Sequence, residues 1–121
     1  MKNDKRIVGM LGLAQKAGKI SSGAFQVEKD IKKGRAYLVI VATDASANTL
    51  KDFRDSCKYY KVPFRVWGDK ETLGHSIGKP FRAVVAVRDQ GFAARLKELL
   101  GGEVDDENFV GGVVYGKNSR I

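Results

Sequence analysis

The clearest chemical pattern in the chain lies between residues 21 and 34, which read as one short helix. Three apolar residues recur there at the spacing of a single buried stripe, namely Ala24, Val27 and Ile31. An aromatic ring and several polar side chains fall outside that stripe: Phe25, Gln26, Lys29, Lys32 and Lys33. An exposed aromatic ring among cations can stack on a base while the ammonium groups neutralise phosphates. Alternatively, the aromatic ring packs under a neighbouring loop and the lysines only keep the chain soluble.

The charge of the chain is strongly basic and unevenly distributed. Its 121 residues include 22 Lys and Arg against 14 Asp and Glu, so the net charge is +8. Residues 103–121 are net acidic, and the basic excess therefore lies in residues 1–102. Such an excess favours a polyanionic partner, with nucleic acid ahead of a membrane surface. The length predicts a single domain over 1–102, followed by an acidic, Gly-rich tail that is flexible or forms a loose hairpin around 109–115.

The composition also predicts the compartment. A single cysteine, Cys57, cannot form an internal disulfide, which is typical of a reducing environment. The basic start is followed by an apolar run over 7–14, but that run contains two glycines and continues as a helix, unlike a signal peptide. We therefore predict a cytoplasmic protein with no membrane partner, and a monomer.

Helices and short apolar runs alternate along the chain. Helices are predicted over 4–17, 23–33, 47–60, 70–77 and 92–100, and strands over 37–42, 62–67 and 83–87. Ser21 or Ser22 is expected to cap the second helix, Ser46 the third and Asp69 the fourth. Two of the strands are continuously apolar, which indicates burial on both faces. The alternation predicts an α/β fold, a three-layer α/β/α sandwich around a central mixed sheet of about four short strands.

No set of side chains forms a convincing catalytic or metal site. His75 is the only histidine, Cys57 lies on an apolar helix stripe as a core thiol would, and Asp44 follows a strand either as a turn-former or as a functional group. Gly9 and Gly12 lack the strand that precedes a dinucleotide-binding motif, so they are predicted to allow close helix packing. We predict a non-enzyme with no cofactor, metal or small-molecule substrate. A small hydrolase or transferase that uses His75, Cys57 or Asp44 is the minor alternative.

Several motifs occur in an order that resembles a known family. A helix ending in LGLAQKAG over 11–18 precedes Ser22-Gly23, a buried strand and then Asp44-Ala45-Ser46. Val62-Pro63-Phe64 and KETLG over 70–74 follow. Over roughly residues 5–100 this order resembles the kink-turn RNA-binding family of large-subunit ribosomal proteins, of the L7Ae and L30e type, and most closely its small bacterial members.

The resemblance implies that the start of the second helix enters the widened groove of a kinked RNA duplex. The family motif G-x-N-E-x-x-K falls on Gly23, Phe25, Gln26 and Lys29, so the glycine and the lysine match. Gln26 can accept a hydrogen bond but lacks the charge of the family's glutamate, and Phe25 can only stack or fill space. We therefore expect a kink-turn preference that is weakened or altered.

The resemblance also implies further RNA contacts. Lys70 matches a family lysine near the RNA backbone, and the family's second contact loop falls near Arg88-Asp89. The predicted RNA-binding residues are Gly23, Phe25, Gln26, Lys29, Lys32, Lys33, Ser46, Lys70 and Arg88. The leading hypothesis is a ribosome-associated or regulatory protein whose partner is structured RNA, either kink-turn-like or ribosomal. The alternative is a protein-interaction domain of the same fold, in which Phe25 docks a partner.

Overall fold

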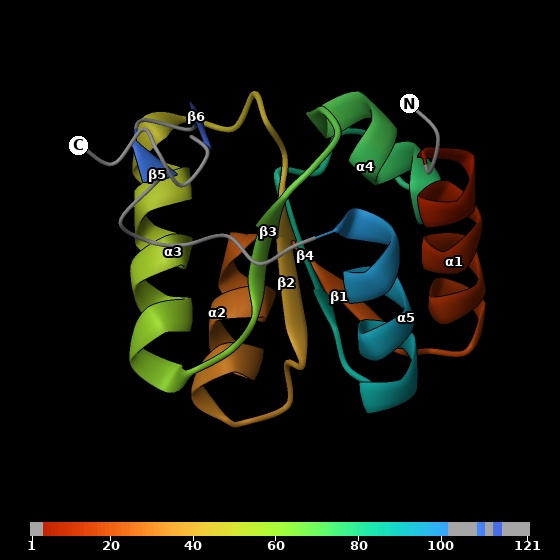
Figure 1. The fold of residues 1–121 in the computed structure, drawn as a ribbon, viewed down its shortest axis with the longest axis horizontal. Helices are drawn as coiled ribbons and strands as arrows, with labels where there is room; N and C mark the ends of the chain where they lie inside the picture. Colours follow the sequence, from red (N-terminus) through yellow and green to blue (C-terminus); the bar gives the residue numbers. More distant parts are fainter. Residues whose placement is uncertain (1–3, 102–108, 111–112, 115–121) are drawn as a thin grey trace.

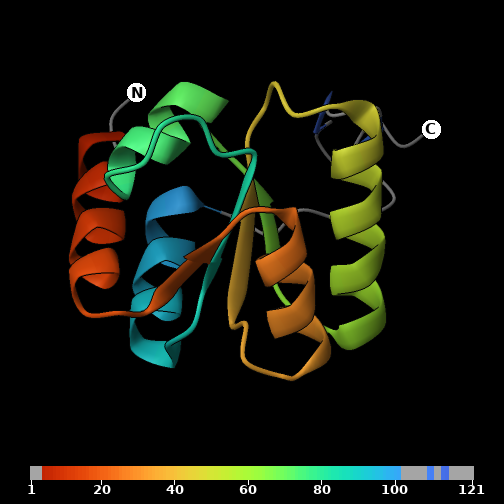
Figure 2. The ribbon, with the colours of Figure 1, turned by 180° about the vertical axis from the view of Figure 1, so that it is seen from behind.

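The computed structural model describes residues 4–101, 109–110 and 113–114 (Figure 1). The elements are α1 (Asp4–Lys16), β1 (Ile20–Ser22), α2 (Ala24–Lys32), β2 (Leu38–Val41), α3 (Ala47–Tyr60), β3 (Phe64–Val66), α4 (Lys70–Ser76), β4 (Val84–Val87), α5 (Gln90–Leu100), β5 (Phe109–Val110) and β6 (Val113–Val114). A four-stranded sheet lies between two layers of helices (Figures 1 and 2). The predicted α/β/α sandwich is therefore confirmed.

The central sheet is mixed, with the strand order β1-β4-β2-β3. β2 pairs in parallel with β3, whereas β4 runs antiparallel to both β1 and β2. Every residue of β2 and β4 is buried, as their continuous apolar sequences predict. Because Val41 pairs with Val84, the end of β2 and the start of β4 meet at the same end of the sheet.

Each face of the sheet is covered by its own set of helices. α2 and α3 bury Val27, Ile31, Phe53 and Cys57 on one face, which confirms Cys57 as a core thiol. The other face is covered by α1, α4 and α5. Tyr60, the last residue of α3, is 40% exposed.

The prediction that Ser21 or Ser22 caps the second helix is wrong. Ile20–Ser22 instead forms β1, which pairs with Val85–Val87. The residue before α2 is Gly23, which has no side chain to act as a cap. A three-residue strand containing two serines lacks the apolar run by which strands are recognised in a sequence, so the ladder with β4 decided its structure.

The other predicted caps are confirmed. Ser46 accepts a hydrogen bond from the Thr49 N–H at the start of α3, and Asp69 accepts one from Thr72 at the start of α4. The bond from the Thr72 N–H lowers the pKa of the Asp69 carboxyl, which stays charged at the helix start where a negative charge is favoured. Asp89 caps α5 in the same way, so that helix begins at Gln90, two residues earlier than predicted.

Close packing through a glycine occurs at Gly74 rather than at Gly9. A Cβ atom on Gly9 would meet nothing within 4 Å, so the packing role predicted for Gly9 is wrong. A Cβ atom on Gly12 would make an ordinary 3.5 Å contact with the Ser76 carbonyl oxygen. A Cβ atom on Gly74 would overlap the carbonyl oxygen of Pro80 and lie 2.6 Å from its carbonyl carbon. Gly74 therefore lets the loop before β4 lie directly against α4.

Gly74→Ala should lower the free energy of unfolding by about 2–3 kcal/mol, because the added methyl group has to displace the Pro80 backbone. Gly9→Ala is the matched control on the exposed side of α1 and should raise stability by about 0.5–1 kcal/mol through helix propensity. Urea denaturation followed by circular dichroism measures both values. Equal effects of the two substitutions would contradict the close contact between Gly74 of α4 and the backbone of Pro80.

Candidate nucleic-acid interface

The start of α2 is shaped by Gly23. Its φ of 90° and ψ of 150° turn the chain sharply from β1 into the helix, in a region that favours glycine. Its N–H donates a hydrogen bond of 3.0 Å to the carbonyl of Val84, which holds this corner on the sheet. α3, α4 and α5 each begin with a side-chain cap, whereas α2 does not. The first-turn N–H groups of α2, which carry partial positive charge, are therefore not capped by Gly23.

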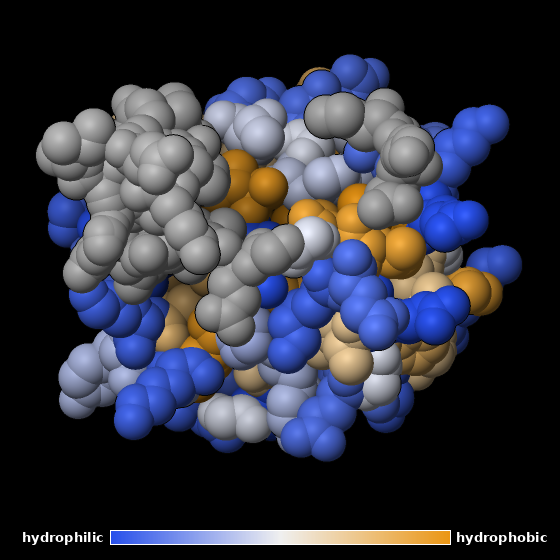
Figure 3. All heavy atoms as spheres, in the orientation of Figure 1, coloured by the Kyte–Doolittle hydropathy of each residue, from blue (hydrophilic) through white to orange (hydrophobic). Residues whose placement is uncertain are grey.

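An outward stripe runs along α2. Phe25 is 82% exposed, and the exposed lysines Lys29, Lys32 and Lys33 follow it along the helix. The alternative that Phe25 packs under a loop is wrong. Val27 and Ile31 are buried as predicted, but Ala24 is exposed because it is the first helical residue and lies beyond the core contacts. Hydrophilic side chains also cover much of the surface over the lower ends of α2 and α3 in Figure 3.

A buried carboxylate lies beneath the sheet-facing side of α2. Asp30 is fully buried and accepts hydrogen bonds from the Ser21 hydroxyl at 2.6 Å and the Gln26 amide nitrogen at 3.1 Å. The Nε atoms of Arg35 and Arg88 lie 3.4 and 3.6 Å from its two oxygens. This network was not predicted from the sequence. Its signal was the position of an acid three residues after Val27, on the buried stripe of the helix.

This network orients the side chain of Gln26. A carboxylate accepts hydrogen bonds, so the amide nitrogen of Gln26 has to face Asp30. The amide oxygen therefore turns away from Asp30 and remains an acceptor for another group. Gln26 thus offers an oxygen in a fixed orientation, as a glutamate would, but without the negative charge.

Three further segments meet beside the start of α2. The Nε atom of Arg82 donates to the Ser22 hydroxyl at 3.1 Å, and the backbone N–H of Arg82 donates to the Lys70 carbonyl at 3.1 Å. The backbone N–H of Lys70 donates to the Asp44 carboxylate at 2.8 Å. Phe81, next to Arg82, is 65% exposed. We call this region the helix-start surface: the first turns of α2 from Gly23 to Lys29, loops 43–46 and 78–83, and Lys70.

The loop that carries Ser46 is held by its own polar residues. Thr43 donates its hydroxyl to the Gly68 carbonyl at 2.8 Å, and Asp44 accepts from Lys70. Asp44 is thus a turn-former that joins this loop to α4. Ser46 caps α3 while remaining exposed at the helix-start surface.

Two groups of predicted residues lie away from this surface. Lys32 and Lys33 lie at the far end of α2, where Lys32 is 3.7 Å from Glu28. Arg88 follows the other end of β4 from Val84, about 13 Å along the strand, and points its guanidinium at Asp30. The structure therefore does not bring Arg88 to the start of α2. The loop that lies beside the start of α2 instead contains Phe81 and Arg82. These two residues were not predicted from the sequence. Their signal was an aromatic residue next to a cation in a segment that contains Gly and Pro.

The residues considered for catalysis do not share a site. Cys57 is buried under α3 on one face of the sheet, whereas His75 is exposed on α4, which covers the other face. Among residues 4–101, 109–110 and 113–114, no three metal-ligating side chains come together. Within the same residues, no helix combines the length and the apolar character that a membrane span requires.

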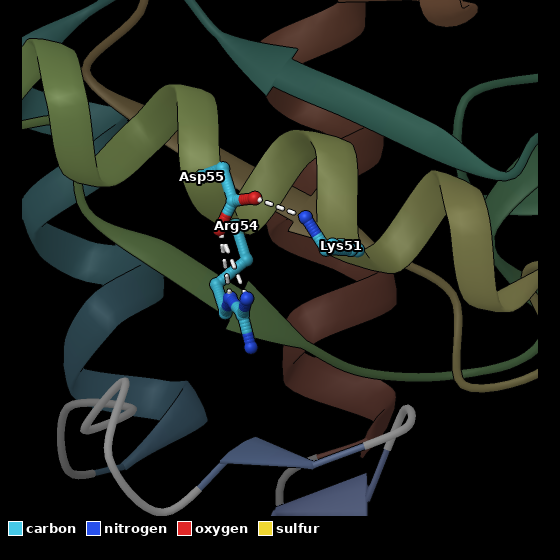
Figure 4. Close-up of polar contacts among 3 residues, drawn as sticks. All are labelled: Lys51, Arg54 and Asp55. Carbon is cyan, nitrogen blue, oxygen red and sulfur yellow. Dashed lines mark hydrogen bonds and ion pairs between the residues drawn. The ribbon is translucent and has the colours of Figure 1, made fainter.

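The acidic residues of α3 are partly neutralised by neighbouring cations. Lys51 Nζ and Arg54 Nη2 each lie 2.9 Å from the carboxylate of Asp55 (Figure 4). The hydrogen bond from Lys51, followed by that from Arg54, lowers the pKa of Asp55. Asp55 is therefore charged at neutral pH, and its charge is balanced locally.

Comparison with known proteins identifies the family. Residues 5–97 match the ribosomal protein L7Ae/L30e/S12e/Gadd45 family. The chain belongs to this family. It is 52% identical over 91 residues to the RNA-binding protein YlxQ of Bacillus subtilis (strain 168), a match that covers 75% of this chain and 91% of the relative. The YlxQ protein of Enterococcus faecium is 41% identical, and the match covers 83% and 96% of the two chains.

A solved structure shares the fold of this chain. The 15.5 kD RNA binding protein of Giardia lamblia superposes with a TM-score of 0.71 at 22% identity, and the match covers 79% of this chain and 85% of that one. The resemblance inferred from the order of motifs, and its placement close to small bacterial L7Ae-family members, are confirmed.

Gln26→Glu should lower the free energy of unfolding by about 1–3 kcal/mol. It replaces a donor to the buried Asp30 with a second carboxylate. Gln90→Glu is the control, because it makes the same charge change at the exposed first turn of α5, where a carboxylate is favoured. Thermal and urea denaturation compare the two variants, and an unchanged stability of Gln26→Glu would contradict the proposed orientation of Gln26.

Proposed function

We propose that this L7Ae-family protein is a non-enzymatic RNA-binding protein that recognises structured RNA of the kink-turn kind through its helix-start surface. The observation that carries the proposal is the start of α2, where Gly23 provides no cap and Phe25 and Lys29 are exposed beside the fixed amide of Gln26. The two YlxQ relatives, which are named as RNA-binding proteins, support it. Membership in a family that includes ribosomal proteins also favours a ribosome-associated or regulatory role.

The electrostatics of this surface suit a phosphate backbone. Lys29, Lys70 and Arg82 supply cations around a helix start whose N–H groups favour an anion. Lys29 has no acidic partner among the residues that the structure describes. Each phosphate neutralised by such a cation steepens the salt dependence of binding by about one logarithmic unit. A few contacts of this kind therefore produce substantial, salt-sensitive affinity.

The base-reading part of the surface differs from the family motif. The Gln26 amide oxygen can accept a hydrogen bond from the amino group of a guanine, with less strength than a carboxylate. The rings of Phe25 and Phe81 can stack on unpaired bases but cannot replace the hydrogen bonds of an asparagine. We infer that the protein keeps the family's mode of approach to RNA and has an altered preference among kinked RNAs.

A protein-interaction role is the second candidate, favoured by the same exposed rings. Phe25 and Phe81 are 82% and 65% exposed, and exposed aromatic residues are typical anchors of protein interfaces. The two roles differ in their dependence on salt, because stacking and docking of apolar rings respond weakly to ionic strength and phosphate contacts respond strongly.

Lys29→Ala should weaken binding to a kink-turn RNA by about tenfold and reduce the salt slope by about one, because one phosphate or base-edge contact is lost. Lys16→Ala, an exposed lysine at the end of α1, is the control and should leave affinity unchanged. Fluorescence anisotropy with a kink-turn RNA and an unkinked duplex, each at two salt concentrations, measures both variants.

The same titration separates the candidate functions. Equal affinity for the two RNAs would contradict kink-turn recognition while retaining general RNA binding. Absence of salt-dependent binding to either RNA would favour the protein-interaction role.

Phe25→Asn should increase the preference for the kink-turn RNA over the unkinked duplex, because it restores the hydrogen-bonding side chain of the family motif. The fold should be unaffected, since the ring is 82% exposed. Phe81→Asn is the control, which removes a comparable exposed ring without restoring the motif. A Phe25→Asn protein that melts at lower temperature, or that loses the preference, would contradict the placement of the recognition surface.

A further inference from the structure

A groove of about 960 Å³ runs between α2 and α3, beside the helix-start surface. Four residues of the outward stripe of α2 form one wall: Phe25, Lys29, Lys32 and Lys33. The wall contributed by α3 ends in two exposed tyrosines, Tyr59 and Tyr60. The proposed function uses only the part of this groove from Phe25 to Lys29, and it does not account for the two tyrosines.

The two ends of the groove are aromatic. Phe25 is 82% exposed and Tyr59 is 78% exposed, which is unusual for rings of this size. Tyr59 packs edge-on against Tyr60, with ring centroids 4.8 Å apart and an interplanar angle of 75°. This contact orients the Tyr59 ring while the solvent still reaches it. The groove therefore has an aromatic platform at each end.

The spacing of these platforms follows from the packing of the helices. Both helices begin at the same end of the sheet, because α2 starts beside Val84 and α3 follows the end of β2. The Ser56 hydroxyl donates a 2.6 Å hydrogen bond to Glu28, which fixes their register. Phe25 lies three residues before Glu28 and Tyr59 three residues after Ser56, so the rings are about 9 Å apart along the groove. At about 3.4 Å per stacking step, that span holds about two bases between the two rings.

The charge of the groove favours a polyanion. Lys29 and Lys33 have no acidic partner within the described part of the chain. The acids on the walls are mostly occupied: Glu28 contacts Lys32 and Ser56, and Asp55 is paired with Lys51 and Arg54. Asp52 is the remaining acid of the lining. Unpaired cations between aromatic platforms are the features that bind single-stranded nucleic acid.

We propose that the α2–α3 groove holds a short single-stranded RNA segment that continues from the structured RNA at the helix-start surface. Bases stack on Phe25 and Tyr59, and Lys29 and Lys33 neutralise the intervening phosphates. The proposal rests on the proposed function and extends it from the start of α2 to the end of α3. It predicts that the protein binds a structured RNA more tightly when an unpaired strand leaves that RNA.

The experiment compares a blunt kink-turn RNA with the same RNA carrying six unpaired adenosines at its 5′ or its 3′ end, by fluorescence anisotropy. One of the two extensions should increase affinity by about tenfold, the effect of one or two stacked bases. Tyr59→Ala should abolish that increase and leave the affinity for the blunt RNA unchanged. Tyr37→Ala, which removes an exposed tyrosine outside the groove, should retain the increase.

Two results would overturn the proposal: neither extension increases affinity, or Tyr59→Ala weakens binding of blunt and extended RNA equally. Free decaadenylate and a decaglutamate peptide are compared as competitors of the extended RNA. Equal displacement by the two would contradict the proposal, because it would show that the groove recognises negative charge alone, as expected for an acidic protein partner. Thermal melting of Tyr59→Ala confirms that the fold is intact.

The free decaadenylate also separates this proposal from the proposed function. If the structured RNA does not bind at all, the proposed function fails, and the groove is then tested by decaadenylate alone. Binding of decaadenylate that depends on Tyr59 would support the groove, and no binding would contradict it.

Discussion

The buried carboxylate of Asp30 is the interaction on which the geometry of the candidate surface depends. It joins β1 through Ser21, the body of α2 through Gln26, and two arginines that follow α2 and β4. A buried charge is costly unless it is paired and hydrogen-bonded, and removal of its partners typically costs about 3–5 kcal/mol. The position of α2 against the sheet and the orientation of Gln26 are therefore linked to one network inside the domain.

The helix-start surface lacks two common sources of stability, a side-chain cap on its helix and burial of its large aromatic rings. α2 lacks a side-chain cap, whereas α3, α4 and α5 each have one. An N-cap side chain typically adds about 1 kcal/mol, so the absence of one leaves donor groups available at a modest cost. Large aromatic rings are exposed at the same end of the sheet, at Phe25 and Phe81. The capped helices and the close contact between Gly74 and Pro80 hold the surrounding loops while these groups stay accessible.

The side chains of α2 face three different environments, which explains the mixed composition of this helix. Val27 and Ile31 face the core, Gln26 faces the Asp30 network, and the stripe from Phe25 to Lys33 faces solvent and the groove beside α3. A helix of nine residues makes only two and a half turns, so each direction receives very few side chains. Phe25 and Gln26 are adjacent in the sequence but belong to two of these directions, Phe25 to solvent and the groove and Gln26 to the Asp30 network.

The sequence by itself determined the layers, the buried strands and, at Val27 and Ile31, the core stripe of α2, because apolar periodicity reports directly which side chains avoid water. It left open whether Phe25 is exposed or packed under a loop, and the structure decided for exposure. Helix caps such as Ser46 and Asp69 were also local enough to predict. The tertiary structure decided what depends on contacts between distant segments: the pairing of β1 with β4, the burial of Asp30, and the meeting of Arg82 with Ser22. Arg88 lies with Asp30 instead of at the start of α2 because β4 carries it to the other end of the sheet, and no local pattern encodes that distance.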